Sequence, residues 1–166
     1  YFEQAGVPAA GMPALTCLGQ PPCGRPRGLE LQAYAVVPGT GSFSIETAGD
    51  GNTGVTEKLY EIGGRRHLYL SGIQGLAADP LRPGTFREQS ARMFADCDRL
   101  LKKHGAGFAD VLRTWCYLGD IDRDYASFNA SRSDCFRTHG VSRYPASTGI
   151  EARLRPERAL CAMDLY

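Results

Sequence analysis

The chain has 166 residues and a mass of 18.0 kDa, which is enough for one hydrophobic core and too little for two of ordinary size. Hydrophobic residues make up 43% and charged residues 22%, which excludes a chain that is disordered throughout. The formal net charge of +1 lacks the surplus of cations that non-specific nucleic-acid binding needs, and no apolar run approaches the roughly 20 residues that span a bilayer. We therefore expect neither a nucleic-acid partner nor a membrane partner.

The N-terminal third is predicted to be an arm followed by an extension of a sheet. Residues 1–28 are rich in proline and glycine and show almost no hydrophobic period. Proline sustains neither a helix nor a strand ladder, so this segment is predicted to be an extended arm. Apolar and polar residues alternate at 31–37 and again at 43–47, which predicts an additional β-hairpin within residues 29–54.

The remaining residues, 55–166, are predicted to form the main domain. Alternating patterns at 55–62 and 67–71 predict two strands, joined by a turn at Gly63-Gly64. Further strands are predicted at 111–118, 146–154 and 159–166.

Two helices are predicted among these strands. The first begins at Thr85, which with Glu88 has the spacing of a capping box, and apolar residues then recur at helical spacing up to Leu101. The second covers about 122–139, with Asp120 or Asp122 as its N-cap.

The order of these elements predicts an α+β fold, in which a mixed β-sheet carries both helices on one face. The opposite face of that sheet needs a cover that the chain does not obviously supply. We expect another subunit to provide it.

The cysteines indicate neither a disulfide scaffold nor a metal site. Cys17 and Cys23 lie in the arm without C-x-x-C spacing or a nearby histidine. The other four fall in apolar segments, where a thiol behaves as a small buried hydrophobe: Cys97, Cys116, Cys135 and Cys161. Reduced thiols, together with a first segment that lacks the pattern of a signal peptide, predict a cytoplasmic protein.

Four sequence blocks, in order and at matching spacing, resemble the Rid (YjgF, reactive intermediate deaminase) family, also described as endoribonuclease L-PSP-like. The blocks are H-L-Y-L-S-G at 67–72, A-D-V-L at 109–112, Y-A-S-F-N at 125–129 and Y-P-A-S-T-G-I-E at 144–151. Within the family the chain looks closest to the C-terminal Rid-like half of chorismatases, which hydrolyse chorismate. The resemblance covers roughly residues 55–166.

The resemblance implies a six-stranded sheet with two helices, in the chorismate mutase-like Rid fold. It also implies a homotrimer whose sites lie in the clefts between subunits, with a small carboxylate as substrate and no cofactor. The ribonuclease name often attached to the family is poorly supported by the net charge of +1.

The resemblance also indicates which residues form the site. In the family's deaminases an arginine follows the Tyr-Pro-Ala block, whereas this chain has Ser147, which cannot form a bidentate guanidinium clamp. Gly149 matches a family cysteine, and Asp164 matches a carboxylate near the end of the last strand. Ser71 and Asn129 match the family's Ser-Gly pair and its helix-borne asparagine.

Asp164 and Glu151 are the candidate acid–base groups. On a sheet face covered by a partner, Asp164 would have a raised pKa and could protonate a leaving group or position water; otherwise it is a solvated aspartate. Glu151 is expected on one strand face with Arg153, either as part of the site or as a surface ion pair.

Arginines are the candidates for binding the substrate's carboxylate. Arg113 interrupts an apolar strand and Arg132 lies on the apolar face of the second helix, positions that arginine rarely takes without an anionic partner. Arg143 and Arg153 complete the set. The alternative for Arg113 and Arg132 is structural pairing with nearby aspartates.

These observations predict a small-molecule enzyme that adds water to an enol-ether, enamine or imine carboxylate. Its most concrete form is a hydrolase similar to the chorismatases, in which backbone amides near Gly149 orient the carbonyl group or the water. The alternative is a non-catalytic trimer that binds a metabolite or a partner peptide, which Ser147 favours because it replaces the deaminase arginine.

Overall fold

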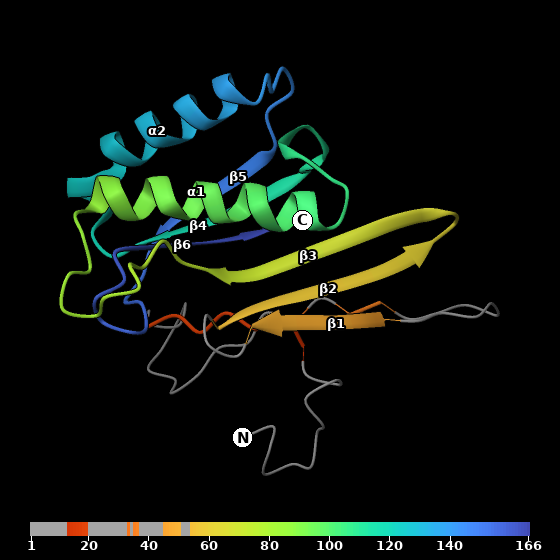
Figure 1. Cartoon of the computed structure of the whole chain (residues 1–166), viewed down its shortest axis with the longest axis horizontal. Helices are drawn as coiled ribbons and strands as arrows, with labels where there is room; N and C mark the ends of the chain where they lie inside the picture. Colours follow the sequence, from red (N-terminus) through yellow and green to blue (C-terminus); the bar gives the residue numbers. More distant parts are fainter. Residues whose placement is uncertain (1–12, 20–32, 34, 37–44, 51–53) are drawn as a thin grey trace, which may run out of the picture.

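The computed structural model describes residues 13–19, 33, 35–36, 45–50 and 54–166 (Figure 1). In this part of the chain the elements are, in order, β1 (Ile45–Asp50), β2 (Val55–Ile62), β3 (Arg65–Ile73), α1 (Phe86–Lys103), the short 3-10 helix η2 (Phe108–Asp110), β4 (Arg113–Leu118), α2 (Ile121–Thr138), β5 (Ala146–Glu151) and β6 (Cys161–Leu165).

The strands form one six-stranded sheet in the order β1-β2-β3-β6-β4-β5. All neighbouring strands are antiparallel except β4 and β5, which run parallel. A parallel pair needs a crossover connection, and α2 provides it between β4 and β5. The predicted α+β fold with a mixed sheet is therefore confirmed.

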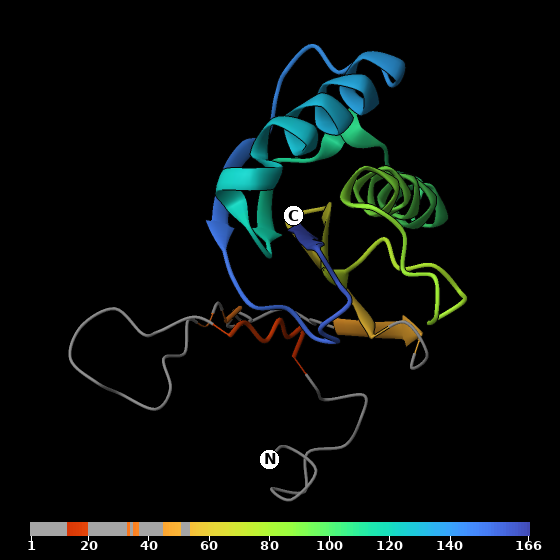
Figure 2. The ribbon, with the colours of Figure 1, turned by 90° about the vertical axis from the view of Figure 1, so that its left-hand side faces the viewer.

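Both helices cover the same face of the sheet (Figure 2). Helix α1 packs on β3 and β6, and α2 packs on β4. The core lies between the helices and the sheet, and its fully buried side chains include Leu70, Met93, Phe108, Phe128 and Met163. Neither helix is apolar enough along its length to cross a membrane.

The two helices begin where the sequence predicts. The Thr85 N–H donates to Glu88 Oε2 over 2.7 Å and the Glu88 N–H donates to Thr85 Oγ1 over 3.4 Å, which is the predicted capping box. Asp120 caps α2 by accepting a hydrogen bond from the Arg123 N–H over 3.0 Å. Each cap satisfies a backbone amide that has no partner within its helix.

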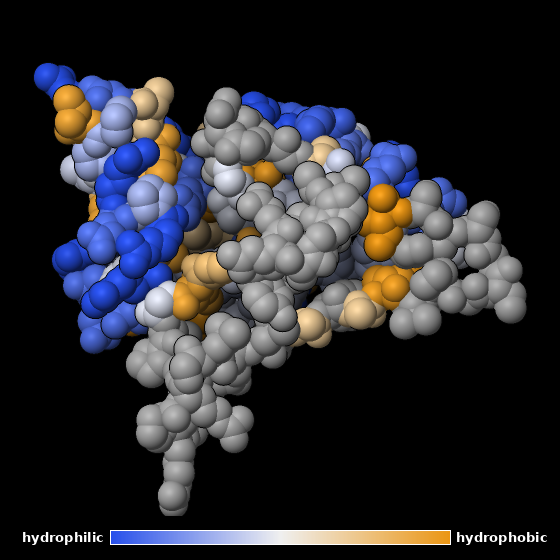
Figure 3. All heavy atoms as spheres, turned by 90° about the horizontal axis from the view of Figure 1, so that it is seen from below, coloured by the Kyte–Doolittle hydropathy of each residue, from blue (hydrophilic) through white to orange (hydrophobic). Residues whose placement is uncertain are grey.

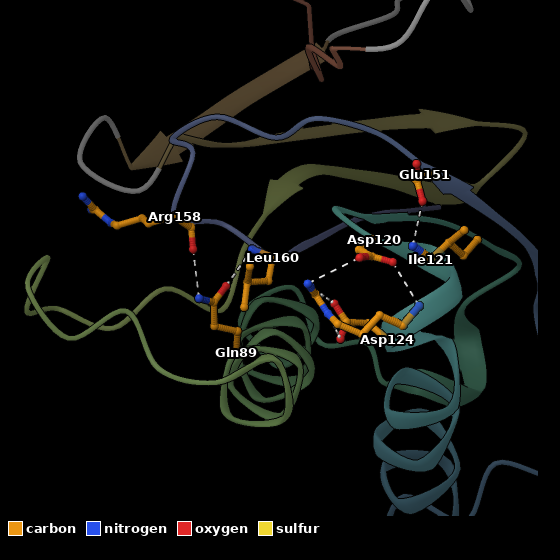
Figure 4. Close-up of polar contacts among 8 residues, drawn as sticks. Gln89, Asp120, Ile121, Asp124, Glu151, Arg158 and Leu160 are labelled. Atoms are coloured by element: carbon orange, nitrogen blue, oxygen red, sulfur yellow. Dashed lines mark hydrogen bonds and ion pairs between the residues drawn. The ribbon is translucent and has the colours of Figure 1, made fainter.

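A buried glutamine fixes the chain that leads into β6. The side chain of Gln89 on α1 donates to the carbonyl of Arg158 over 3.0 Å and accepts from the Leu160 N–H over 2.9 Å (Figure 4). It also donates to the carbonyl of Pro83 over 3.1 Å. These bonds satisfy backbone groups that a loop would otherwise leave without partners, and they fix the start of the strand that carries Asp164.

The structure differs from the sequence-based prediction mainly at strand ends. Strand β4 begins at Arg113 rather than 111, because the 3-10 turn of Phe108–Asp110 precedes it. Strand β5 ends at Glu151 rather than 154, and beyond it the backbone of Arg153 pairs with Gly19 instead. Of the predicted N-terminal hairpin, the strand at 31–37 lies largely outside the described residues.

A buried carboxylate links β2 to the end of α1. Glu57 is 4% exposed and accepts hydrogen bonds from Lys103 Nζ, 2.9 Å from each carboxylate oxygen, and from His104. Burial alone would raise the pKa of Glu57, but the hydrogen bonds from His104 and Lys103 outweigh it and lower the pKa below its ordinary value of 4.5. The group therefore stabilises the fold above that ordinary value, and the contribution is lost as the pH falls through the folded pKa.

We expect Glu57→Gln to lower the unfolding free energy at pH 7 by about 1–3 kcal/mol, the range for hydrogen bonds to a charged group. Urea titrations at decreasing pH should show the deficit shrinking below pH 4.5. Glu61→Gln, at an exposed carboxylate of the same strand, is the control and should change the stability by less than about 0.5 kcal/mol. A deficit that is constant with pH would contradict this assignment.

Candidate functional site

The candidate site lies on the open face, by which we mean the face of the sheet turned away from α1 and α2. Met163 and Leu165 belong to the core under the helices, so the alternation of side chains along β6 places Asp164 on the open face. Asp164 lies opposite Trp115 of β4 in the antiparallel register. On β4 the same alternation brings Arg113 and Tyr117 to this face.

Three donors hold the carboxylate of Asp164. Oδ1 accepts from the Gly72 N–H over 2.8 Å, and Oδ2 accepts from the Tyr117 hydroxyl over 2.9 Å. The hydroxyl of Thr16 lies 2.7 Å from both carboxylate oxygens. Gly72 has a φ of +75° at the point where β3 and β6 shift register, a conformation that favours glycine and presents its amide to the acid.

Burial raises the pKa of Asp164, and the hydrogen bonds from Gly72, Thr16 and Tyr117 offset that increase only in part. Burial, together with the nearby charge of Asp164, also raises the pKa of Tyr117, so its hydroxyl remains a donor. A carboxyl group that keeps its proton to a higher pH than usual is suited to general acid catalysis.

A buried hydroxyl group belongs to the residue before Gly72, whose amide binds this acid. Ser71 is 6% exposed, and among the described residues its Oγ has no hydrogen-bond partner. Buried polar groups are nearly always paired, so this hydroxyl is an exception within the described part of the chain.

Arg113 provides a positive charge on the open face. Its guanidinium carbon lies 4.8 Å from the centre of the Trp115 ring, and Nη2 donates to Thr148 Oγ1 over 2.7 Å. Within the described part of the chain it forms no ion pair with a carboxylate. The alternative of structural pairing with Asp110, Asp120 or Asp124 is absent there. Asp120 and Asp124 pair with Arg123 instead (Figure 4), and Asp110 accepts a hydrogen bond from the Gly107 N–H.

A second group of predicted residues lies on the other face of the sheet, beneath α2. Arg132 Nη2 donates to Asn129 Oδ1 over 2.7 Å, and Nη1 lies 3.5 Å from Ser147 Oγ. Ser147 also accepts from the Thr114 hydroxyl over 3.0 Å. The structure therefore brings Asn129, Arg132 and Ser147 together but separates them from Asp164 by the thickness of the sheet.

The remaining predicted residues surround β5. Glu151 Oε2 accepts a hydrogen bond from the Ile121 N–H over 2.9 Å at the start of α2 (Figure 4). Gly149 pairs with Cys116 of β4, and Arg143 is exposed in the loop that precedes β5. Because β5 ends at Glu151, that residue and Arg153 do not share a strand as expected.

The four cysteines of the main domain contribute little nucleophilic character. Cys97, Cys116 and Cys161 are buried, as predicted, whereas Cys135 is only half-buried. Burial raises the pKa of the Cys161 thiol to about 12 and that of Cys135 to about 11, so neither forms a thiolate readily near neutral pH.

Sequence reasoning missed the three contacts of Asp164, although Gly72 belongs to one of the blocks that carry the resemblance. Tyr117 lies two residues from Trp115 on a strand that was predicted, so alternation alone could have placed it on the open face. Thr16 carried no comparable signal, because it lies in a Pro/Gly-rich segment far from β6 in sequence.

Residues 60–165 match the family model described as endoribonuclease L-PSP. A RutC family protein from Leuconostoc mesenteroides subsp. cremoris is 28% identical over 102 residues, which is 59% of this chain and 76% of that protein. A 2-iminobutanoate/2-iminopropanoate deaminase from Bos taurus is 27% identical over 94 residues, which is 55% of this chain and 65% of the deaminase.

Solved structures share the fold. A YjgF family protein from Neisseria meningitidis has a TM-score of 0.50 at 25% identity. The superposition covers 64% of this chain and 81% of the Neisseria protein. Yeast Mmf1 has a TM-score of 0.53 at 18% identity over the same shares of the two chains, a likeness of fold alone. Since the family model spans β2 to β6, the chain belongs to the Rid/YjgF family.

Proposed function

We propose that the protein adds water to an enol-ether, enamine or imine carboxylate, with Asp164 as the general acid. The observation that carries this proposal is a half-buried carboxyl group whose pKa is raised, bonded to Gly72, Thr16 and Tyr117. Ser71, the residue before Gly72, has a hydroxyl without a partner among the described residues.

The chemistry follows from the donors around Asp164. For an enol ether, protonated Asp164 transfers its proton to the methylene carbon, and water adds to the oxocarbenium ion that results. The adduct loses a proton and breaks into a keto acid and an alcohol, and the released proton restores Asp164. For an imine the same addition releases ammonia. The carboxylate formed in between is stabilised by hydrogen bonds from Gly72, Thr16 and Tyr117.

Arg113 is the proposed partner of the substrate's carboxylate. It shares the open face with Asp164, its charge is not neutralised by a described carboxylate, and its guanidinium is oriented by Trp115 and Thr148. Glu151 is less suited to the acid role, because it is exposed and its carboxylate already accepts the Ile121 N–H. The name of the bovine relative supports the imine class of substrate.

We also propose that the protein forms a homotrimer through the open face. Ile45 and Ile62, both 48% exposed, lie on β1 and β2 toward the end of the sheet farthest from β5. Seen from below, the side of the molecule away from the helices presents apolar side chains, drawn in orange in Figure 3. Covering such side chains stabilises an assembly.

The test is an assay of the purified protein with chorismate, in which the released pyruvate is measured. Asp164→Asn is expected to lower the rate by about 10²–10⁴-fold, the usual contribution of a general acid. Glu157→Gln, at a 76% exposed carboxylate in the turn before β6, is the control and should retain the rate.

Pyruvate at the rate seen without enzyme would discard the enol-ether version. The imine version is then tested by ammonia release from 2-iminopropanoate, with the same two variants. An Asp164→Asn variant as active as the wild type on either substrate would remove Asp164 from the mechanism.

A second candidate is a binding module without turnover. It is favoured by Ser147, whose hydroxyl is bonded to Thr114 where the family's deaminases have an arginine. Arg132 does not replace that arginine freely, because its guanidinium is bonded to Asn129. Calorimetric binding of chorismate that remains chemically unchanged would support this candidate.

A further inference from the structure

We propose that residues 13–19 are part of the active site, where Thr16 is a positioning residue that holds the carboxyl group of Asp164. This inference rests on the proposed role of Asp164 as the acid. The segment lies outside residues 60–165, which match the family model, so the matched domain alone does not contain this residue. The contact joins residues 148 positions apart in the sequence.

The segment lies along the open face as an extended chain. Leu15, Cys17 and Gly19 are exposed, whereas Ala14, Thr16 and Leu18 are half-buried. This period of two is typical of an extended backbone that rests on a surface. The segment, red in Figures 1 and 2, runs on the side of the sheet away from the helices.

Two contacts beyond Thr16 fix the segment. Leu18 packs against an apolar cluster on the open face that consists of Tyr117, Leu154, Ala159 and Ala162. Gly19 pairs with Arg153: its N–H donates to the Arg153 carbonyl over 2.8 Å, and the Arg153 N–H donates back over 3.1 Å. A chain anchored on both its apolar and its polar groups holds the Thr16 hydroxyl in one place.

The Gly19 pairing requires a residue without a side chain. A Cβ at Gly19 would lie 2.8 Å from the Cβ of Arg153 and 3.1 Å from its carbonyl oxygen. Neither atom is the flexible end of a side chain, so an alanine would force the two backbones apart. Gly19→Ala therefore offers a way to loosen the segment without altering Thr16 or Asp164.

The Thr16 hydroxyl donates to the carboxylate of Asp164 from 2.7 Å, a bond that favours the charged form of the acid. The other described groups that face Asp164 are the Tyr117 hydroxyl, the Gly72 amide and Trp115, which lies opposite it on β4. The positive charge of Arg113 lies on the same face of β4, and the buried thiol of Cys116 lies on the opposite face. Among the described hydrogen-bond partners of Asp164, Thr16 is thus the one from outside the sheet.

The first test is a titration of the Asp164 carboxyl carbon by NMR, with its signal assigned by comparison with Asp164→Asn. The Thr16 hydrogen bond favours the charged form, so Thr16→Val, which keeps the shape and removes the hydroxyl, should raise the pKa of Asp164. Thr16→Ser should leave the pKa unchanged. Leu15→Ala, at an exposed neighbour, is the matched control and should also leave it unchanged.

The second test separates positioning from a purely structural role. In the pyruvate-release assay Thr16→Val should lower kcat by about tenfold and leave KM within about twofold, and Thr16→Ser should restore kcat. An acid works in its protonated form, so activity declines as the pH rises through its pKa. The raised pKa in Thr16→Val should therefore move this basic limb to higher pH.

Gly19→Ala should speed amide hydrogen exchange at Arg153 and lower kcat, as Thr16→Val does. Higher activity in Gly19→Ala would mean that the segment obstructs the site, and this would overturn the inference. So would an Asp164 pKa, or a kcat, that Thr16→Val leaves unchanged. If the wild-type protein releases no pyruvate, the proposed function fails, while the titration still decides whether Thr16 holds Asp164.

Discussion

Gly75→Ala is expected to lower the unfolding free energy by about 3 kcal/mol, at the upper end of what overpacking usually costs. Gly75 is buried just after β3, where the chain passes directly against α1. A Cβ there would lie 1.7 Å from the carbonyl oxygen of Gln89 and 2.6 Å from the backbone nitrogen of Met93. Both atoms belong to the helix backbone, so no side chain can move aside and α1 itself must shift from the sheet.

Urea unfolding followed by tyrosine and tryptophan fluorescence would measure this loss. Gly107→Ala is the matched control, because a Cβ at Gly107 meets nothing within 4 Å and its φ of −146° suits any residue. The control should change the stability by no more than about 0.5 kcal/mol. Equal urea midpoints for the two variants would show that α1 does not lie as close to Gly75 as described.

The sequence predicted the helices well because their signals are local. The capping box of Thr85 and Glu88, and the cap of Asp120, consist of residues three apart, so they are visible without a tertiary structure. Strand ends were predicted less well. Strand β5 stops at Glu151 because the next segment pairs with Gly19, and a contact over that distance leaves no trace in the local pattern.

The candidate site was predictable only in part, for the same reason. Asp164 was proposed as a site residue from its strand and from the resemblance, and the structure places it half-buried on the open face with three hydrogen-bond donors. Its donors come from three distant places, β3, β4 and the arm, and only Tyr117 follows from alternation along a predicted strand. The predicted residues also divide between two faces of the sheet, because Ser147 and Asp164 lie on different strands whose register a single sequence does not reveal.

The open face of the sheet is partly covered by the N-terminal segment of the same chain. The sequence left this face without a cover and predicted a second subunit. In the structure residues 13–19 cover part of it, since Leu18 packs on the apolar cluster near Leu154 and Thr16 reaches Asp164. Proline and glycine gave this segment no helical or strand period, yet an extended chain can still align its alternate side chains with a sheet.

Asp164→Asn is expected to raise the stability of the protein at pH 7, because it removes a carboxyl group whose charged form is disfavoured by burial. Its pKa is raised in the folded protein, so the stability associated with this group is fully present below its ordinary value of 3.8 and is lost as the pH rises through the folded pKa. Asp164→Asn removes the charge and keeps the shape, and the hydroxyl groups of Thr16 and Tyr117 can rotate to accept from its amide. The variant that loses activity is therefore expected to be more stable than the wild type at pH 7.

Thermal melts of the two proteins over a range of pH would measure this trade-off. The Tm values should coincide below pH 3.8, where Asp164 is neutral in both the folded and the unfolded protein. The advantage of Asp164→Asn should then grow as the pH rises and level off above the folded pKa. Asp79→Asn, at an exposed aspartate, is the control and should show no such pH-dependent gain. If Asp164→Asn were instead less stable at pH 7, the three donors would outweigh burial, the pKa of Asp164 would not be raised, and the property that suits it to the acid role would be lost.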